Sequence, residues 1–445
     1  MLDQMFTADN FRRIYDSENR KGRDLAKEFF PSLEPHTLAV KNKVVELKQL
    51  RAIKPPAATF AAQVSVLKKA IGSLKAKKSA AIDAELETIS SNVLSSAYKI
   101  SLTKSAGPKG KDVYIVDGSA ESYFVVKQLQ KNLNALYDVK QANRHELVCQ
   151  VRDTIAGRFP LELVRTDIAN FYETVDRKGL LLKLEADQLL SPSSKKYIKQ
   201  ILDAFGHLSG SAKGIPRGVG VSAYLAELYL RPIDREIRAM PGLVLYCRYV
   251  DDIVALFARP PIGPTLGAYN SLVSNALSKH GLVQNSKKTF DFDLAGTGPF
   301  KFEYLGYRFC VEKTVRLAPS AAKIRKCRAR VRAAFGEYVS ERVTDPRKAY
   351  RNLVARLKFL TGNTRLLNSK SGAVTGLWYN NALADDIGAF ELLDKRLKTR
   401  IAALTSTKLQ KRLKKLTFVS GFTNRRFHNF STRELQNIVR VWNHG

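Results

Sequence analysis

The chain has 445 residues and is strongly basic, with 74 Lys and Arg against 41 Asp and Glu, a formal net charge of +33. Such an excess repels itself, and a phosphate backbone is the usual partner that relieves the repulsion, so we expect nucleic-acid binding rather than an incidentally basic surface. The cysteines and histidines are scattered and do not have the spacing of zinc ligands. No apolar segment is long enough to span a membrane. The N-terminus has early acids and no apolar core of a signal peptide, so we expect a cytoplasmic protein without membrane contact.

The composition along the chain changes from helical to mixed and back to helical. Residues 1–100 are rich in Ala, Leu and Lys with apolar residues three and four apart, which predicts helices interrupted by the prolines of IKPPAA. A Gly- and Pro-containing loop at 105–112 precedes a mixed region with a hairpin-like YDVKQANRHELV at 137–148. Residues 163–309 alternate β-branched or aromatic runs with helices, which predicts an α+β fold. The remainder is again helical, and residues 313–445 carry 29 Lys and Arg against 8 Asp and Glu.

The stretch CRYVDDIVALF, residues 247–257, sets two adjacent carboxylates inside an apolar run. In a continuous strand Asp251 and Asp252 would point to opposite faces, and one of them would enter a core unpaired. A hairpin with the Asp-Asp pair at its tip resolves this conflict. An ordinary acidic turn is the alternative at this point.

A third acid lies 84 residues upstream of this pair, in LVRTDIANFYETVD. A strand predicted from Leu161 to Thr166 ends at Asp167, where its carboxylate can meet a hairpin tip from a neighbouring strand. Asp167, Asp251 and Asp252 together would form an all-oxygen site suited to Mg²⁺. Two such ions about 4 Å apart stabilise the attacking and the leaving oxygens in phosphoryl transfer.

These acids belong to a series of five motifs that resembles the palm of a reverse transcriptase. In chain order the motifs are TDIANFY (166–172), GIPRGVGVSAYLAELYL (214–230), YVDD (249–252), LVQNSKKTF (282–290) and FEYLGYRF (302–309). Each motif alone is weak evidence for the family. All five motifs in the right order would rarely occur together by chance. The resemblance implies an RNA-directed DNA polymerase with a right-hand α+β fold of fingers, a palm with an antiparallel sheet and a helical thumb, preceded by a helical N-terminal extension.

The resemblance implies roles for residues around the acids. Asp167, Asp251 and Asp252, with the Ile168 carbonyl, would bind two Mg²⁺ ions, for which Mn²⁺ is a substitute. Lys288 would lie near the triphosphate, although SKK is alternatively a solvated face. The last motif would be the primer-grip hairpin, for which plain core strand is the alternative; its residues are Tyr304, Leu305, Gly306 and Tyr307.

Sugar selection and triphosphate binding are implied for three further positions. Tyr172 would exclude the 2′-hydroxyl of a ribonucleotide, with core packing beside Phe171 as the alternative. Lys140 and Arg144, around the predicted turn before a helix, would grip the triphosphate, with surface charge as the alternative.

The glycine-proline-glycine motif departs from the family pattern at one position. Gly218 permits close approach of the backbone to a ligand. Arg217 stands where the family usually carries Gln before this glycine, and it adds a charge and a five-donor fork. The replacement of Gln by Arg217 affects what can be expected of base recognition, whereas the expected metal chemistry does not depend on it.

The resemblance also predicts a domain order. Residues 1–110 would form the N-terminal extension, 111–166 the fingers, 167–310 the palm (176–213 partly fingers) and 311–445 a basic thumb that binds nucleic acid.

No further catalytic or zinc-binding constellation accompanies the motifs, so the chain looks most like the bacterial stand-alone group of retron, abortive-infection and defence-associated reverse transcriptases. This group implies a structured noncoding RNA as template, deoxynucleoside triphosphates as substrates, a DNA product and a role in antiphage defence. A second protein encoded nearby or another copy of the chain are further candidate partners. The alternatives are a catalytically silent RNA-binding palm protein and a template-independent nucleotide transferase.

Overall fold

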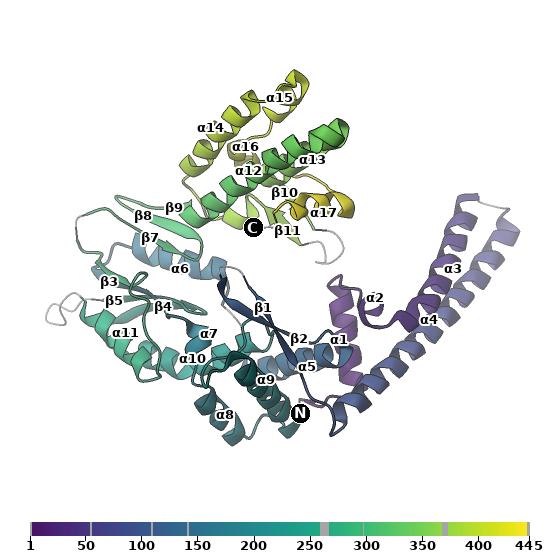
Figure 1. The fold of residues 1–445 in the computed structure, drawn as a ribbon, viewed down its shortest axis with the longest axis horizontal. Helices are drawn as coiled ribbons and strands as arrows, with labels where there is room; N and C mark the ends of the chain where they lie inside the picture. Colours follow the sequence, from purple (N-terminus) through teal and green to yellow (C-terminus); the bar gives the residue numbers. More distant parts are fainter. Residues whose placement is uncertain are drawn as a thin grey trace. The chain divides into compact units, whose positions relative to one another are not determined.

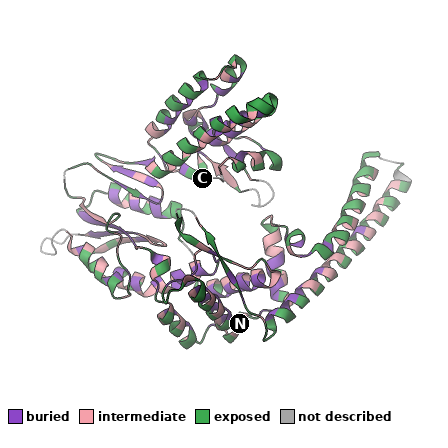
Figure 2. Ribbon diagram, viewed as in Figure 1, coloured by how far each residue is buried: buried purple, intermediate pink, exposed green. Residues whose placement is uncertain are grey.

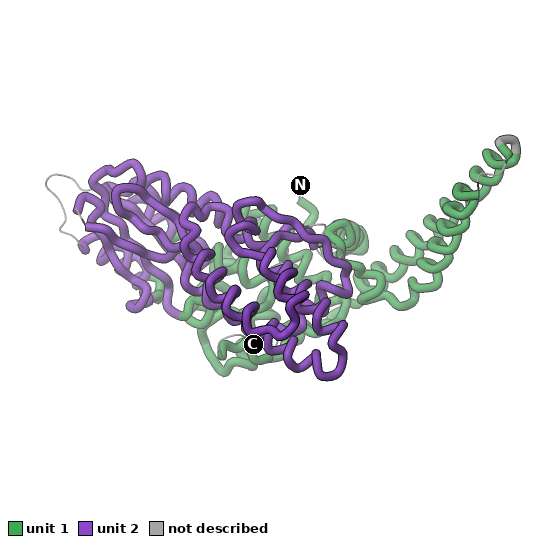
Figure 3. Tube along the Cα trace, turned by 90° about the horizontal axis from the view of Figure 1, so that it is seen from above, with its two compact units in different colours: residues 1–141, 170–232, 280–282 green, residues 142–169, 233–279, 283–445 purple. Residues whose placement is uncertain are grey.

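A computed structural model describes residues 2–53, 56–107, 110–139, 142–258, 267–296, 298–366 and 373–442 (Figure 1). The chain divides into two compact units, each built from segments that are far apart in the sequence (Figure 3). Unit 1 comprises residues 1–141, 170–232 and 280–282, and unit 2 comprises residues 142–169, 233–279 and 283–445. None of the helices in the described part of the chain is both long enough and apolar enough to cross a membrane.

Unit 1 is mainly helical. Its helices are α1 (Ala8–Arg20), α2 (Leu25–Phe29), η1 (Pro31–Leu33), α3 (Glu34–Ile53), α4 (Ala57–Leu94), α5 (Ala120–Tyr137), α7 (Phe171–Thr174), α8 (Arg177–Ala186), α9 (Pro192–Ser209) and the first part of α10 (Ser222–Arg238). Helix α1 buries one apolar face, and its Phe11 ring lies 5.3 Å from the ring of Phe124 in α5. The predicted helical N-terminal region is therefore confirmed.

Helices α3 and α4 form a long antiparallel hairpin within unit 1. Helix α3 ends at Ile53 and α4 begins at Ala57, so the predicted interruption by IKPPAA is confirmed. No residue of α3 is buried (Figure 2).

Strands β1 (Leu102–Ala106) and β2 (Asp112–Val116) make a two-stranded antiparallel sheet in unit 1. After α5 the chain turns at Asp138, whose φ is +46°, and helix α6 (Arg144–Ala156) of unit 2 begins behind Asn143. The Asn143 side chain caps α6 by accepting a hydrogen bond from the His145 N–H at 3.0 Å. No described residue of 137–148 lies in a strand, so the hairpin-like reading is wrong for these residues, whereas the helix predicted to follow the turn is confirmed as α6.

The centre of unit 2 is a four-stranded antiparallel sheet with the strand order β4-β5-β3-β6. The strands are β3 (Leu161–Asp167), β4 (Leu243–Tyr249), β5 (Asp252–Ala258) and β6 (Phe290–Asp293). Every residue of β3 is buried, as expected for a central strand. The predicted strand from Leu161 is confirmed, and it extends to Asp167 itself.

A second antiparallel sheet in unit 2 consists of β7 (Phe300–Tyr304), β8 (Tyr307–Val311) and β9 (Val315–Pro319). The rest of unit 2 is mostly helical, as predicted, with one further short sheet. Its elements are α11 (Ala268–Ser278), α12 (Ala321–Thr344), α13 (Pro346–Thr361), β10 (Asn363–Arg365), β11 (Val374–Gly376), η3 (Tyr379–Asn381), α14 (Gly388–Ala402), α15 (Thr407–Leu413), α16 (Phe418–Thr423) and α17 (Thr432–Arg440).

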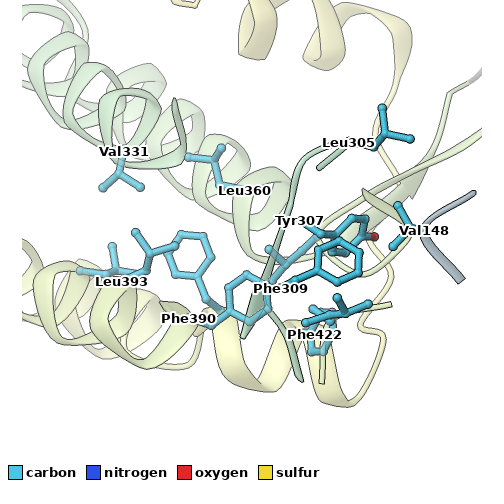
Figure 4. Close-up of a cluster of buried hydrophobic side chains, with 14 of the residues drawn as sticks. Val148, Leu305, Tyr307, Phe309, Val331, Leu360, Phe390, Leu393 and Phe422 are labelled. Carbon is cyan, nitrogen blue, oxygen red and sulfur yellow. The ribbon is translucent and has the colours of Figure 1, made fainter. Parts of the chain in front are cut away.

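One apolar cluster joins the second sheet to the C-terminal helices of unit 2 (Figure 4). Phe309 of β8 is fully buried in it, and Phe390 of α14 and Phe422 of α16 are in ring contact at 4.9 Å. Burying an apolar side chain of this size contributes about 1.5–3 kcal/mol to the stability of the fold, so the cluster stabilises strand β8. The predicted α+β fold with an antiparallel sheet is confirmed.

Candidate active site

The end of β3 brings two of the predicted carboxylates together. In the antiparallel pairing of β3 with β5, Asp167 lies directly opposite Asp252. Directly opposed residues project on the same face, so the two carboxylates share one side of the sheet. Next to them, the Ile168 N–H donates a hydrogen bond to the Asp251 carbonyl at 2.9 Å. All these residues belong to unit 2.

The hairpin that carries Asp251 and Asp252 has a different tip from the predicted one. Tyr249 pairs with Asp252, so the two-residue turn is Val250–Asp251 and Asp252 is the first residue of β5. Val250 has a φ of +56°, which is a costly conformation for a β-branched residue and amounts to about 1–3 kcal/mol. The prediction of a hairpin is correct, but the Asp-Asp tip was wrong, because a turn of two residues leaves the second acid in the strand.

Two cations neutralise the paired acids. The Lys288 ammonium lies 2.7 Å from Oδ2 of Asp167, and the Arg165 guanidinium binds Oδ1 of Asp252. Arg165 is buried within β3 and also donates to the Lys288 carbonyl at 2.7 Å. Burial is the main cause that raises the pKa of Asp252, and the carboxylates of Asp167 and Asp251 raise it further against the opposing charge of Arg165. The three acids therefore repel one another in the folded protein.

Arg165 and Asn285 are site residues that the sequence reasoning missed. Asn285 donates from its side chain to Oδ1 of Asp167 at 3.1 Å, and its N–H donates to the Asp167 carbonyl at 2.7 Å. It therefore fixes both the backbone and the carboxylate of Asp167. One signal was readable for Arg165, a charged residue inside the apolar strand LELVRTD two positions before the acid.

The donor set fits a divalent cation in its chemistry. Asp167, Asp251, Asp252 and the Ile168 carbonyl offer oxygen only, which hard cations prefer. The pKa of Asp252 is raised first by burial and further by the carboxylates of Asp167 and Asp251. Within the described ranges, however, no three His, Cys, Asp or Glu side chains converge closely enough to hold a metal ion as they stand. Lys288 and Arg165 supply the positive charge instead.

Tyr172 and Arg217 lie together in unit 1. The Arg217 guanidinium lies over the Tyr172 ring at 5.1 Å and pairs with Glu173 at 2.9 Å. The Ile215 N–H donates to the Tyr172 carbonyl at 2.8 Å, so the GIPRG turn is bound to helix α7. Phe171 is buried whereas Tyr172 is only half-buried, so the neighbouring phenylalanine fills the core here.

Gly218 is required by the backbone at its position. Its φ is +100°, and a Cβ there would come within 2.5 Å of the Val113 side chain and 2.8 Å of the Tyr114 carbonyl. The Tyr114 N–H also donates to the Arg217 carbonyl at 2.7 Å. The close approach that the glycine permits is thus to strand β2 of the same unit.

Arg144 is the first residue of α6, and its guanidinium lies 4.9 Å from the ring centre of Tyr249, the first residue of YVDD. A cation over an aromatic face is attracted by about 0.5–2 kcal/mol. Lys140 lies outside the described residues.

The predicted primer-grip residues form a tight hairpin between β7 and β8. Tyr304 pairs with Tyr307, and Leu305 and Gly306 form the turn with φ values of +46° and +82°. Positive φ at both positions is the I′ geometry that closes two-residue hairpins. Both tyrosines are buried, and the Tyr304 hydroxyl donates to the Cys247 carbonyl at 3.4 Å, so Tyr304 holds the hairpin to β4.

Comparisons with known proteins identify one family that part of the chain matches. Residues 125–309 match the family model described as reverse transcriptase (RNA-dependent DNA polymerase). A search of curated proteins found no match. The match agrees with the predicted reverse transcriptase domain for residues 125–309.

Among solved structures, telomerases of two Candida species are similar at low identity. A truncated apo telomerase of Candida tropicalis has 14% identity over 52% of this chain and 56% of its own, with a TM-score of 0.37. Telomerase of Candida albicans with a fragment of telomeric RNA has 14% identity over 71% of this chain and 54% of its own, with a TM-score of 0.36. The chain spans about half the length of these two structures. Such low scores carry no argument about function.

Proposed function

We propose that this chain, whose residues 125–309 form a reverse transcriptase domain, is an RNA-directed DNA polymerase that joins deoxynucleotides by two-metal nucleotidyl transfer. The observation that carries the proposal is the pairing of Asp167 with Asp252 across two strands of that domain, with Asp251 in the adjoining turn. Three acids from two separate segments lie at the adjoining ends of β3 and β5, where Lys288 and Arg165 pair with two of them.

In this proposal Asp167, Asp251 and Asp252, with the Ile168 carbonyl, hold two Mg²⁺ ions, for which Mn²⁺ can substitute. When bound, the ions stabilise the attacking and leaving oxygens of the reaction. Asn285 orients the Asp167 carboxylate through its 3.1 Å hydrogen bond.

Lys288 and Arg165 have different roles in this proposal because their exposure differs. The Lys288 side chain is 51% exposed, whereas that of Arg165 is 8% exposed. Lys288 is thus free to leave Asp167 and to neutralise or protonate the departing pyrophosphate. Arg165 stays in the sheet and favours the charged form of Asp252 against the effect of burial.

Tyr172, Glu173 and Arg217, which lie together in unit 1, are suited to selecting the incoming nucleotide. Tyr172 is proposed to exclude the 2′-hydroxyl, with its ring held by Arg217 on one side. Arg217 is itself held by Glu173, so the charge that it adds at the usual Gln position is partly neutralised. Gly218, Arg144 and Lys140 are proposed to contact the incoming triphosphate.

The biological setting is proposed from the stand-alone motif pattern. Residues 1–110 serve as the extension, 111–166 as fingers, 167–310 as palm and 311–445 as a thumb that grips nucleic acid, with the hairpin Tyr304–Tyr307 as primer grip. The template is a structured noncoding RNA, the product is DNA, and the role is antiphage defence in the cytoplasm, with a second protein or another copy of the chain as partner.

The test is nucleotide incorporation by the purified chain with an RNA template, a DNA primer, deoxynucleotides and Mg²⁺. The matched control is Asp251→Asn, which keeps the shape and removes the charge. Synthesis that requires the template and Asp251 is expected. Equal synthesis without any template would indicate a nucleotide transferase, and RNA binding without synthesis would indicate a silent palm protein.

A further inference from the structure

Unit 2 contains a cavity of about 740 Å³ outside the carboxylate site. It is lined by the Leu305–Gly306 turn, one face of helix α12, the segment Thr375–Asn381 and Trp442 of the C-terminal end. This volume lies within the range of about 300–1,000 Å³ that is typical of ligand pockets.

The charge of this cavity is entirely positive. Its described lining includes four Lys and Arg and no Asp or Glu; the four are Arg144, Lys323, Lys326 and Arg330. Three of the four lie over aromatic rings, at 4.9 Å for Arg144 on Tyr249, 4.3 Å for Lys323 on Tyr307 and 5.2 Å for Arg330 on Trp442. An aromatic face positions a cation without cancelling its charge, so these cations remain available to an anion.

Lys323 is a largely desolvated cation in the wall of this cavity. Its ammonium donates to the Asn380 carbonyl at 2.6 Å and to Oδ1 of Asn381 at 3.2 Å. Burial, and then the positive charge of Arg144, lowers the pKa of Lys323 to about 8. A bound anion would reverse this effect, because it favours the charged form of the lysine.

The arrangement of the cations suits a phosphate chain. Lys323, Lys326 and Arg330 follow one face of α12 at spacings of three and four residues and span about 10 Å along the helix axis. On the other wall, Tyr379 is 43% exposed, and its ring is held edge-on by Trp378 at 4.9 Å. The Tyr379 ring also meets the Phe427 ring at 6.0 Å, and its 43% exposure leaves part of the ring open to a base.

We propose that this cavity binds an unpaired nucleotide of a single nucleic-acid strand, with phosphates on the α12 cations and the base stacked on Tyr379. Stacking on an exposed aromatic ring next to a basic groove is how proteins hold single strands without sequence preference. Within a duplex the faces of the bases are already stacked on each other, which leaves none for Tyr379. The proposal rests on the proposed function in one respect, that the strand comes from the template or product of the same enzyme.

The test is binding of a fluorescently labelled eight-nucleotide RNA to the full chain in EDTA, where metal-dependent synthesis does not occur. Tyr379→Ala is expected to weaken binding at least about fivefold, and Tyr379→Phe to retain it, because the ring is what stacks. Lys326→Glu is expected to weaken binding and to reduce the slope of log affinity against log salt by about one. The matched control is Arg328→Glu, which reverses an exposed charge on the same helix away from the cavity and should change affinity less than about threefold.

Unchanged affinity in both Tyr379→Ala and Lys326→Glu, with unchanged thermal unfolding, would overturn the proposal. Competition distinguishes the ligands: unlabelled single strand should displace the probe better than the same sequence as a duplex. Displacement by free ATP at lower concentration than the single strand would mean that the site takes a free nucleotide and would overturn the strand assignment. Incorporation is measured separately. If the variants synthesise DNA normally and bind the strand as the wild type does, this inference is contradicted and the proposed function is not. If the wild type binds the strand but does not synthesise DNA, the proposed function is contradicted and this inference is not.

Discussion

Glu341 on helix α12 offers the sharpest test of how unit 2 is held together. Its carboxylate receives hydrogen bonds from the Arg356 guanidinium at 3.2 and 3.4 Å and from the Asn352 amide at 3.0 and 3.1 Å, both on helix α13. Arg440 approaches the same carboxylate at 3.8 Å. The Arg356 side chain is only 1% exposed, so its charge depends on this one acid. The perturbation is Glu341→Gln, which keeps the shape and removes the charge.

The magnitude follows from the burial of the partner left behind. Removing one member of a buried ion pair costs about 3–5 kcal/mol, because the remaining charge is left without compensation in a medium of low polarity. In a unit of this size each kcal/mol lowers the unfolding temperature by about 2–4 °C, so Glu341→Gln should lower it by about 6–20 °C. The loss should also reach the cationic face of α12, since Glu341 fastens that helix to α13.

The assay uses a property of the sequence. The chain has two tryptophans, Trp378 and Trp442, and both lie in unit 2. Tryptophan fluorescence during thermal unfolding therefore reports on unit 2 alone. The matched control is Glu312→Gln, whose pair with Arg316 at 3.4 Å is 53% exposed on the arginine side. A surface pair of this kind contributes about 0–1 kcal/mol, so the control should shift the transition by less than about 4 °C.

Two results would refute the reasoning. One is a shift of equal size in Glu341→Gln and Glu312→Gln, which would mean that Arg356 finds water in the folded unit. The other concerns the double variant Glu341→Leu with Arg356→Leu. Replacing both partners by apolar residues should cost less than Glu341→Leu alone, because no unpaired charge remains. If the double variant loses as much as the two single variants together, the pair is not coupled.

The remaining predictions concern the proposed polymerase. Asp167→Asn and Asp251→Asn should each abolish Mg²⁺-dependent incorporation while RNA binding in EDTA is retained; synthesis near the wild-type level in either would contradict the metal assignment. Tyr172→Ala should raise the ratio of ribonucleotide to deoxynucleotide incorporation, because it opens space beside the 2′-hydroxyl, and an unchanged ratio would make Tyr172 a packing residue. Reversing four exposed charges around α15 should weaken binding of an RNA–DNA hybrid and flatten a wild-type salt slope expected to be at least about −3, whereas an unchanged slope would place the contact elsewhere. The four are Lys411, Arg412, Lys414 and Lys415.

The sequence predicted the centre of the candidate site because each acid carries a local signal. Asp167 ends an apolar strand, and Asp251 and Asp252 interrupt another one, so both segments could be placed at strand ends before their pairing was known. The turn was misplaced by one residue. Positive φ normally favours Gly, Asn or Asp, and nothing in YVDD indicates that Val250 would adopt it.

The cations around the acids could not be predicted, since their contacts are distant in sequence. Arg165 reaches Asp252 across 87 positions, and Lys288 reaches Asp167 across 121. A single sequence contains no information on such a pairing until the register of the sheet is known. The hairpin-like reading of 137–148 is wrong for a local reason: helix α5 extends to Tyr137, and the helix that was predicted to follow the turn begins at Arg144 behind the Asn143 cap.

The role of each cation behind the net charge of +33 depends on what that cation contacts. At the adjoining ends of β3 and β5, Arg165 and Lys288 are bound to carboxylates, so their charge is used within the protein. In the cavity beside α12, Lys323 and Arg330 lie instead over aromatic rings, which orient them and leave their charge uncancelled. Repulsion between the cations of the cavity destabilises the folded protein, and a bound anion relieves it. The protein is therefore more stable with an anion in the cavity than without one. Strand binding should therefore raise the unfolding temperature of unit 2, and it should do so less in Lys326→Glu than in Arg328→Glu.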